Sequence, residues 1–235
     1  NISANQFVML AMSIVKQHFM NWLMLCWMPN WKSKGKIMTT LIALQHDDWC
    51  LIAADSQVTG NGVAMDYSAM GKIAKNGQYL VAAAGLVRGI NILQHAFVPP
   101  IPTKKNLDKF MVSRFVPELR KTFIESGYDI KSDGDPASHD NDFIVAVNGT
   151  LYFIDEAYGV ERINNKLYCA GSGMKLALGA AYALGAHKCK DYAKAVDILH
   201  RAVKAAIEFD INSGGKVQIA LQKKTGETFI ELLDD

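Results

Sequence analysis

Apolar and polar positions alternate along residues 39–235 in patterns typical of paired strands. Two apolar runs, TTLIALQH (residues 39–46) and WCLIAAD (residues 49–55), are separated by the polar pair Asp47-Asp48. This arrangement predicts two adjacent strands joined by a tight turn. Three later segments repeat it: residues 72–85 with Asn76-Gly77, residues 142–163 with Asn148-Gly149, and residues 216–232. Asn-Gly between apolar runs is a strong hairpin signal, so the pattern predicts antiparallel sheets.

Helical periodicity occupies two pairs of segments between these strands: residues 85–97 and 106–127, then residues 173–186 and 191–210. In the last segment, apolar residues recur at steps of three and four, which gives one apolar face. We expect Pro117 to bend or interrupt the second segment. The order of strands and paired helices predicts an α+β fold, a four-layer αββα sandwich of two antiparallel sheets between helices.

Residues 1–38 have a different character. They hold six of the ten Met and three of the four Trp. Their apolar stretch is interrupted by Lys16, Gln17, His18 and Asn21, whereas a membrane span needs roughly 20 mostly apolar residues. Three interpretations remain open: a removable pro-segment, a membrane or partner-binding helix, or codons upstream of a misassigned start. We favour the third and then the first, so we divide the chain into an extension (1–38) and one domain (39–235).

The composition excludes several classes of protein. Half of the residues are hydrophobic and 20% are charged, which allows a large buried core. Residues 1–38 hold four of the 25 basic residues and none of the 23 acidic ones, so no basic face for nucleic acid is indicated in the domain. No cysteine forms a CxxC pair or a zinc-ligand spacing with His. We therefore expect no metal, no cofactor and a reducing compartment.

Polar residues stand beside several strand and helix ends, and each has two interpretations. Asp55 follows an apolar strand, as a turn residue or as part of a site. Lys72 alternates with apolar neighbours, as a solvated strand residue or as part of a site. Ser172 lies between two Gly before a helix, where an N-cap turn is the simpler explanation. Asp210 and Ser213 follow a helix, where stop signals are common.

Together with Met38-Thr39-Thr40, these segments resemble a known family. MTTLIA, AADSQVT, GKI, AAAG, CAGSG and DINSGGKV occur in the order of the catalytic β-type proteasome subunits. The phrasing is most similar to the bacterial HslV-like branch and to proteasome-like proteins of phages. The resemblance covers nearly all of residues 39–235 and none of residues 1–38. It implies a threonine endopeptidase of the N-terminal-nucleophile hydrolase class.

The resemblance also implies a role for the tandem threonines. The mature chain of the family begins at the position of Thr39, whose Oγ would attack the peptide carbonyl. A hydroxyl is a weak nucleophile and needs a base. A free α-amine has a pKa of about 7.7–8.0 and can accept that proton, whereas an amide nitrogen cannot. This is the chemical reason for Thr39 to be a terminus.

The remaining matched positions are given roles by the same resemblance. Asp55 and Lys72 would form a buried ion pair beside Thr39, lowering the pKa of the nucleophile and its amine. The family uses further groups to support the amine, to build the oxyanion hole and to line the substrate pocket. The matching residues are Ser172, Asp210 and Ser213 for the amine, Gly85 for the oxyanion hole and Ala83 for the pocket.

Two features depart from the family pattern. Lys72 follows Asp55 by 17 positions, one more than the family shows, and we expect the segment TGNGVAMDYSAM (residues 59–70) to be a loop that absorbs the difference. Lys72 rather than Lys75 is assigned because strand alternation puts Lys75 on the other face. Met38 stands where self-processed pro-segments present Gly, which fits removal of an initiator Met better than autolysis.

The expected protein is a homo-oligomeric, cytoplasmic peptidase subunit of a bacterial or phage-infected cell. It would form stacked hexameric or heptameric rings that cleave unfolded polypeptides in an enclosed chamber. An ATPase unfoldase would be a separate protein, since the sequence lacks GxxxxGK[ST]. We expect no nucleic-acid or membrane partner. Two alternatives stay open: a non-catalytic structural ring subunit of the same fold, and an N-terminal-nucleophile amidase for a small substrate.

Overall fold

The computed structural model describes residues 36–37, 39–60, 63–103, 105–129, 137–163 and 166–234. The expectations for residues 1–38 lie outside the described residues, except for the backbone of Lys36 and Ile37. Residues Gly35–Asp235 form one compact unit. The boundary that we place between residues 38 and 39 stays a prediction.

The described strands form two large antiparallel sheets and a small ribbon. The first sheet contains β1 (Lys36–Ile37), β6 (Ile73–Asn76), β7 (Tyr79–Leu86), β8 (Asn141–Val147), β9 (Thr150–Ile154) and β10 (Val160–Arg162). The second sheet has the order β11 (Leu167–Ala170), β2 (Leu41–Gln45), β3 (Trp49–Asp55), β12 (Val217–Lys223) and β13 (Thr228–Leu233). The ribbon pairs β4 (Gln57–Gly60) with β5 (Val63–Asp66). The predicted α+β class with antiparallel sheets is confirmed.

Helical turns are found in all four predicted segments. They comprise α2 (Val87–Asn91) with the π turn η2 (Ile92–Ala96); α3 (Leu107–Phe110), the π turn η3 (Met111–Phe115) and α4 (Val116–Glu125); α5 (Met174–Ala183) with the 3₁₀ turn η4 (Ala186–Lys188); and α6 (Tyr192–Phe209). The helix is not interrupted at Pro117, because the backbone stays helical from Leu107 to Glu125; the local irregularity is the π turn η3, which directly precedes α4 and its Pro117. Proline lacks an N–H, and the first turn of a helix does not need that donor.

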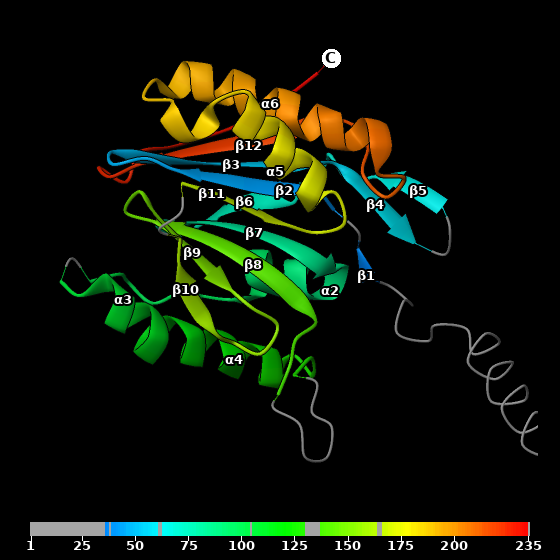
Figure 1. Cartoon of the computed structure of the whole chain (residues 1–235). Helices are drawn as coiled ribbons and strands as arrows, with labels where there is room; N and C mark the ends of the chain where they lie inside the picture. The colour runs from blue at the N-terminus through cyan, green and yellow to red at the C-terminus, as the bar shows by residue number, and fades with distance from the viewer. Residues whose placement is uncertain are drawn as a thin grey trace, which may run out of the picture. The chain divides into compact units, whose positions relative to one another are not determined.

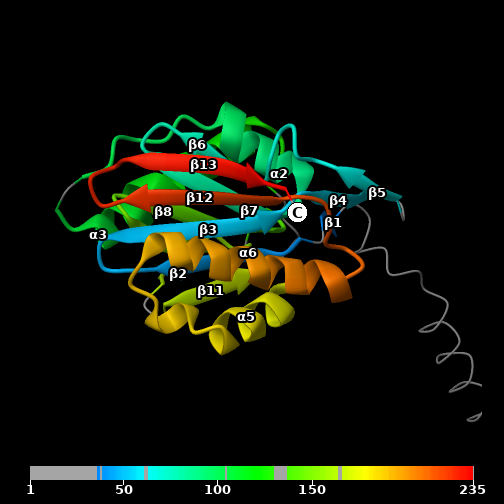
Figure 2. The same ribbon diagram turned by 90° about the horizontal axis from the view of Figure 1, so that it is seen from above.

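Three hydrophobic clusters lie between the layers of helices and sheets. Figure 1 shows α5 and α6 above the second sheet, and α3 and α4 below the first. Figure 2, seen from above, shows α5 and α6 alongside β11, β2, β3 and β12. Alternate residues of β7 serve two clusters, because side chains in a strand point to opposite faces. Leu80 and Ala82 pack between the sheets, whereas Tyr79 and Val81 pack against the helices.

The hairpin turns agree with the predicted ones to within one residue. Val147 pairs with Thr150, so the predicted Asn148-Gly149 forms the turn. Asn76 pairs with Tyr79, which moves the other turn one residue later, to 77–78.

The segment 59–70, which we expected to be a loop, contributes to the ribbon of β4 and β5. Strand β5 has no apolar alternation to recognise, because all four of its residues are exposed.

A buried histidine gives the domain a predicted pH dependence. His139 is completely buried and stacks on Phe123 and Phe143, and its Nδ1 accepts the Asn141 N–H at 3.2 Å. Burial lowers the pKa of His139 to about 4. The unfolded chain, with a His pKa near 6.5, then binds more protons than the folded chain between these values. Stability should therefore fall by about 3 kcal/mol as the pH decreases from about 6.5 to about 4.

Urea unfolding measured between pH 4 and pH 7 checks this. His139→Phe keeps the aromatic packing and removes the titrating group, so its stability should change less over the same interval. Equal slopes in the wild type and the variant would show that His139 is not the linked group.

Candidate active site

A buried ion pair joins the ends of strands from both sheets. Asp55 is the last residue of β3 and pairs with Val217 of β12. Lys72 lies directly before β6 rather than within a strand, which corrects our placement of it. Lys72 Nζ donates to Asp55 Oδ1 at 2.7 Å, and both side chains are 0% exposed. Burial lowers the pKa of Lys72, and the charge of Asp55 opposes this effect. Lys75, the other candidate, is exposed.

The Asp55 carboxylate is held by backbone donors as well as by Lys72. Oδ1 accepts the Thr40 N–H at 2.8 Å, and Oδ2 accepts the N–H groups of Gly214 at 3.0 Å and Gln57 at 3.2 Å. Four donors satisfy a carboxylate that would otherwise be costly to bury. The turn-residue interpretation is therefore incomplete, since Asp55 ties together three distant segments.

Thr39 lies against the turn that precedes α5. Its carbonyl oxygen accepts the Gly173 N–H at 3.5 Å. A Cβ on Gly171 would lie 1.9 Å from that oxygen, and Gly171 has a φ of +88°. Only glycine fits such a close approach at this backbone conformation. Thr39 is 0% exposed, and its Oγ1 has no hydrogen-bond partner among the residues that the structure describes.

The three remaining polar candidates form one hydrogen-bonded group beside the threonines. Ser172 Oγ and Ser213 Oγ donate to Asp210 Oδ2 at 2.6 and 2.7 Å. Ser213 Oγ also lies 2.7 Å from Thr40 Oγ1. Burial raises the pKa of Asp210, but the hydrogen bonds from Ser172, Ser213 and Asn212 outweigh it and lower the pKa below its ordinary value. Helix α6 positions the group, because Asp210 is its C-cap.

Gly85 and Ala83 are both in β7, in different surroundings. Gly85 pairs with Ile37 of β1, two residues before Thr39, and with Asn141 of β8. Ala83 is completely buried in the cluster between the first sheet and the helices. The oxyanion role of Gly85 and the pocket role of Ala83 both stay predictions.

The sequence reasoning missed several contributors to this site. Thr40 supplies a backbone donor to Asp55 and a hydroxyl partner to Ser213, and its place in MTT was the available signal. The N–H of Gly214 reaches Asp55 across 159 positions. The SGG motif marked this loop, but its partner could not be read from the sequence.

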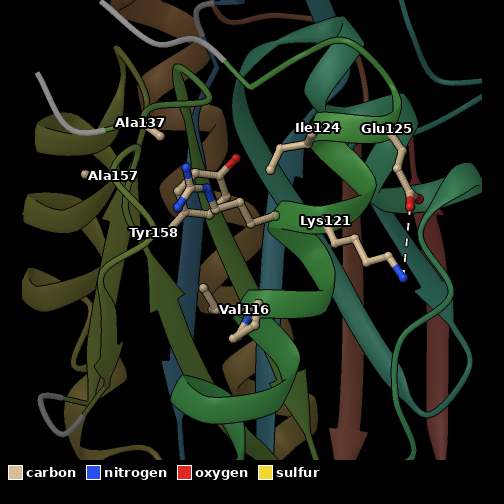
Figure 3. Close-up of a pocket in the computed structure, with 9 residues that line it drawn as sticks. Val116, Lys121, Ile124, Glu125, Ala137, Ala157 and Tyr158 are labelled. Carbon is tan, nitrogen blue, oxygen red and sulfur yellow. Dashed lines mark ion pairs between the residues drawn. The ribbon is translucent and has the colours of Figure 1, made fainter. Parts of the chain in front are cut away.

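A cavity of about 850 Å³ lies away from these residues, between α4 and the segments of Ala137 and Tyr158 (Figure 3). It is lined by Val116, Pro117, Arg120, Lys121, Ile124, Glu125, Ala137, Ala157 and Tyr158. None of the predicted site residues lines it. In the described part of the chain, His, Cys, Asp and Glu do not gather in threes as a metal site would require, and no helix has the length and apolarity to cross a membrane.

Comparison with known proteins gives structural relatives only. No protein-family model matches the chain, and no curated protein matches it. BPH from Thiobacillus denitrificans superposes with a TM-score of 0.63 and 26% identity, covering 79% of this chain and 98% of its own. BPH in complex with epoxomicin gives the same values. A Gly-1 mutant of Anbu from Hyphomicrobium sp. strain MC1 superposes with a TM-score of 0.60 at 13% identity, covering 83% and 86%, and shows the fold alone.

Both neighbours are proteasome-like relatives of the N-terminal-nucleophile hydrolases. The resemblance seen in the sequence motifs therefore agrees with the structural likeness to BPH, whereas the likeness to Anbu concerns the fold alone.

Proposed function

We propose that this chain is a threonine-type peptidase subunit whose nucleophile is Thr39. One observation carries the proposal: the buried Asp55–Lys72 pair binds the backbone N–H of Thr40, the residue next to Thr39. A buried ion pair often contributes no net free energy of folding. A catalytic role beside Thr39 therefore explains this pair better than stability does. The structural likeness to BPH at 26% identity supports the same class of enzyme.

The proposed reaction begins after residues 1–38 are removed. The free α-amine of Thr39 accepts the proton of its own Oγ as Oγ attacks the peptide carbonyl. The acyl group is thereby transferred to Thr39, the protonated amine gives its proton to the leaving amine, and water then releases the acyl product.

The surrounding residues have supporting roles in this scheme. Lys72 provides a positive charge that favours the neutral amine and the ionised hydroxyl. Ser172 and the Asp210–Ser213 pair orient the new amine by hydrogen bonds. The N–H of Gly85 stabilises the oxyanion, a contribution of roughly 2.7–4 kcal/mol for one such donor.

The position of β1 supports an extended polypeptide as the substrate. Lys36 and Ile37 pair antiparallel with Leu86 and Gly85 of β7. A chain that precedes Thr39 thus runs along the strand that carries the proposed oxyanion donor. A substrate strand adding to the same edge would place its carbonyl groups beside Gly85 by main-chain pairing.

We infer the αββα sandwich of the N-terminal-nucleophile hydrolases, supported by the three hydrophobic clusters between successive layers. We also propose assembly into stacked rings enclosing a chamber, a separate ATPase partner, and a cytoplasmic location. Residues 1–38 would be absent from the working enzyme.

Intact-mass and N-terminal analysis of the purified native protein tests the central step. We expect a chain that starts at Thr39, hydrolyses unstructured polypeptides, and binds epoxomicin as BPH does in its complex. A stable and fully active protein that retains residues 1–38 would contradict the mechanism.

The same preparation separates the two alternatives. Hydrolysis of small amides without hydrolysis of peptides would indicate the amidase. A correctly processed chain that assembles but hydrolyses neither would indicate a structural subunit.

A further inference from the structure

Lys72 lies outside the strands, although its ammonium group is 2.7 Å from Asp55 Oδ1. It lies between Gly71 and Ile73, immediately before β6 begins. Strand β6 pairs only with β7 in the described sheet, so its other edge is without a neighbouring strand. The edge of β6 next to Lys72 is therefore open to contacts from outside the first sheet.

A side chain from the second sheet occupies that free edge. Gln218 Oε1 accepts the Ile73 N–H at 2.9 Å, and Gln218 Nε2 donates to the Ile73 carbonyl oxygen at 2.8 Å. In a strand, the N–H and C=O of one residue point to the same side, so a single carboxamide can replace a neighbouring strand at that residue. The Gln218 amide makes both bonds.

Gly71 provides the space for this contact. A Cβ built on Gly71 would lie 2.6 Å from Gln218 Nε2, and the φ of Gly71 is +71°. On the other side, Gln94 Nε2 donates to the Gly71 carbonyl oxygen at 3.3 Å. The backbone on both sides of Lys72 is thus held by glutamine amides.

Strand β12 connects the Gln218–Ile73 hydrogen bonds to Asp55, the ion-pair partner of Lys72. Gln218 directly follows Val217, which pairs with Asp55 in the ladder between β12 and β3. One strand therefore positions the carboxylate through its backbone and the lysine segment through a side chain. The connecting segment adds a further restraint, because the Gly71 N–H donates to the Tyr67 carbonyl oxygen at 2.8 Å.

We propose that Gln218 is a positioning residue that sets the location of Lys72 relative to Asp55 and Thr39. Its catalytic consequence rests on the proposed function, but the placement of Lys72 is testable without it.

The chain contains a matched control on the same strand. Gln222 also bridges the sheets with its amide, accepting the Gly149 N–H at 3.0 Å and donating to the Gln78 carbonyl oxygen at 3.1 Å. It makes the same kind of contact at hairpin turns that, among the described residues, share no hydrogen bond with the group around Thr39. Gln218→Met and Gln222→Met each remove two hydrogen bonds and keep the side-chain length. An effect on Lys72 that is specific to the Gln218 contact should therefore appear only in Gln218→Met.

The first measurement is amine acylation followed by mass spectrometry, with the exposed Lys75 as internal standard. We expect the acylation rate of Lys72, relative to that of Lys75, to be roughly fivefold higher in Gln218→Met than in the wild type, because the segment around Lys72 opens more often. In Gln222→Met the relative rate should equal that of the wild type. Gln218→Asn, one methylene shorter, should act in the same direction if the Met variant does not fold. Equal labelling of Lys72 in the wild type and the Gln218 variants would overturn the proposal.

The second measurement is the pH dependence of kcat/KM for a fluorogenic peptide, per folded chain. The charges that act on Lys72 are those of Asp55 and Asp210. With Lys72 displaced, the Thr39 amine loses part of the field that favours its neutral form. The acid limb should move up by about 0.5 pH unit in Gln218→Met, with kcat/KM lower by about tenfold. If Lys72 is acylated faster in Gln218→Met but the acid limb of the pH profile does not move, Gln218 has only a structural role and the catalytic consequence is overturned.

If the wild type is inactive, the proposed function is refuted, and the acylation of Lys72 alone decides whether Gln218 positions it.

Discussion

Thr39→Ala is expected to lower peptide hydrolysis by at least about 10³-fold while the domain stays folded. The variant removes the only atom proposed to bond to the substrate. Thr39 Oγ1 has no hydrogen-bond partner in the described residues, so its loss leaves no buried group unpaired. The free energy of unfolding should therefore change by no more than about 1 kcal/mol. Hydrolysis of a fluorogenic peptide and urea unfolding of the processed protein measure the two effects.

The neighbouring threonine is the control for this prediction. Thr40 Oγ1 lies 2.7 Å from Ser213 Oγ, so Thr40→Val should cost about 1 kcal/mol of stability through the lost hydrogen bond. It keeps the Thr40 N–H that binds Asp55, and measurable turnover should remain. The reverse order, with Thr40→Val inactive and Thr39→Ala active, would assign the nucleophile to Thr40. Full activity in both variants would remove the threonines from the mechanism.

Lys72→Met is expected to reduce both stability and catalysis. It leaves the Asp55 carboxylate completely buried without its ammonium partner, and breaking a buried pair in this way costs about 3–5 kcal/mol. The positive charge that assists the Thr39 amine is lost at the same time, so we expect kcat/KM to fall by at least about 100-fold. Chemical unfolding and peptide hydrolysis, measured on the same preparation, separate the two losses.

The double variant Asp55→Asn/Lys72→Met distinguishes a catalytic pair from a structural one. It removes both charges, so no isolated carboxylate remains, and part of the lost stability should return. Activity should not return, because the field at Thr39 is still absent. Recovery of hydrolysis together with stability would show that the pair only supports the fold.

Much of the fold could be predicted from local patterns. The strand pairs follow from apolar runs separated by turn residues, and an irregularity near Pro117, seen as the π turn η3, follows from the missing N–H of proline. The ribbon of β4 and β5 escaped prediction because β5 is exposed along its whole length and lacks the alternation that burial imposes. The turn at 77–78 differed by one residue, since strand register depends on the whole ladder.

In the candidate site, too, the residues could be predicted from the sequence but their contacts could not. Thr39, Asp55, Lys72, Ser172, Asp210 and Ser213 were found from short motifs in a fixed order, without knowledge of their contacts. Their geometry depends on partners far apart in the chain, such as Gly214 on Asp55 and Gln218 on Ile73. The Gln218 amide and the Gly214 N–H belong to no sequence motif for these contacts. Their roles could therefore be recognised only from the packing of the two sheets.

By itself, the sequence determined the strand and helix periods, the turns, and the residue types that suit a nucleophile with its own amine as base. These follow from interactions between near neighbours and from the chemistry of single side chains. Strand alternation already favoured Lys72 over Lys75, but only the tertiary structure showed that Lys72 reaches Asp55 and that Thr40, Gly214 and Gln218 contact the pair and its flanking backbone. Those contacts join residues from both sheets, and the packing of the sheets sets which donors and acceptors come within hydrogen-bond distance.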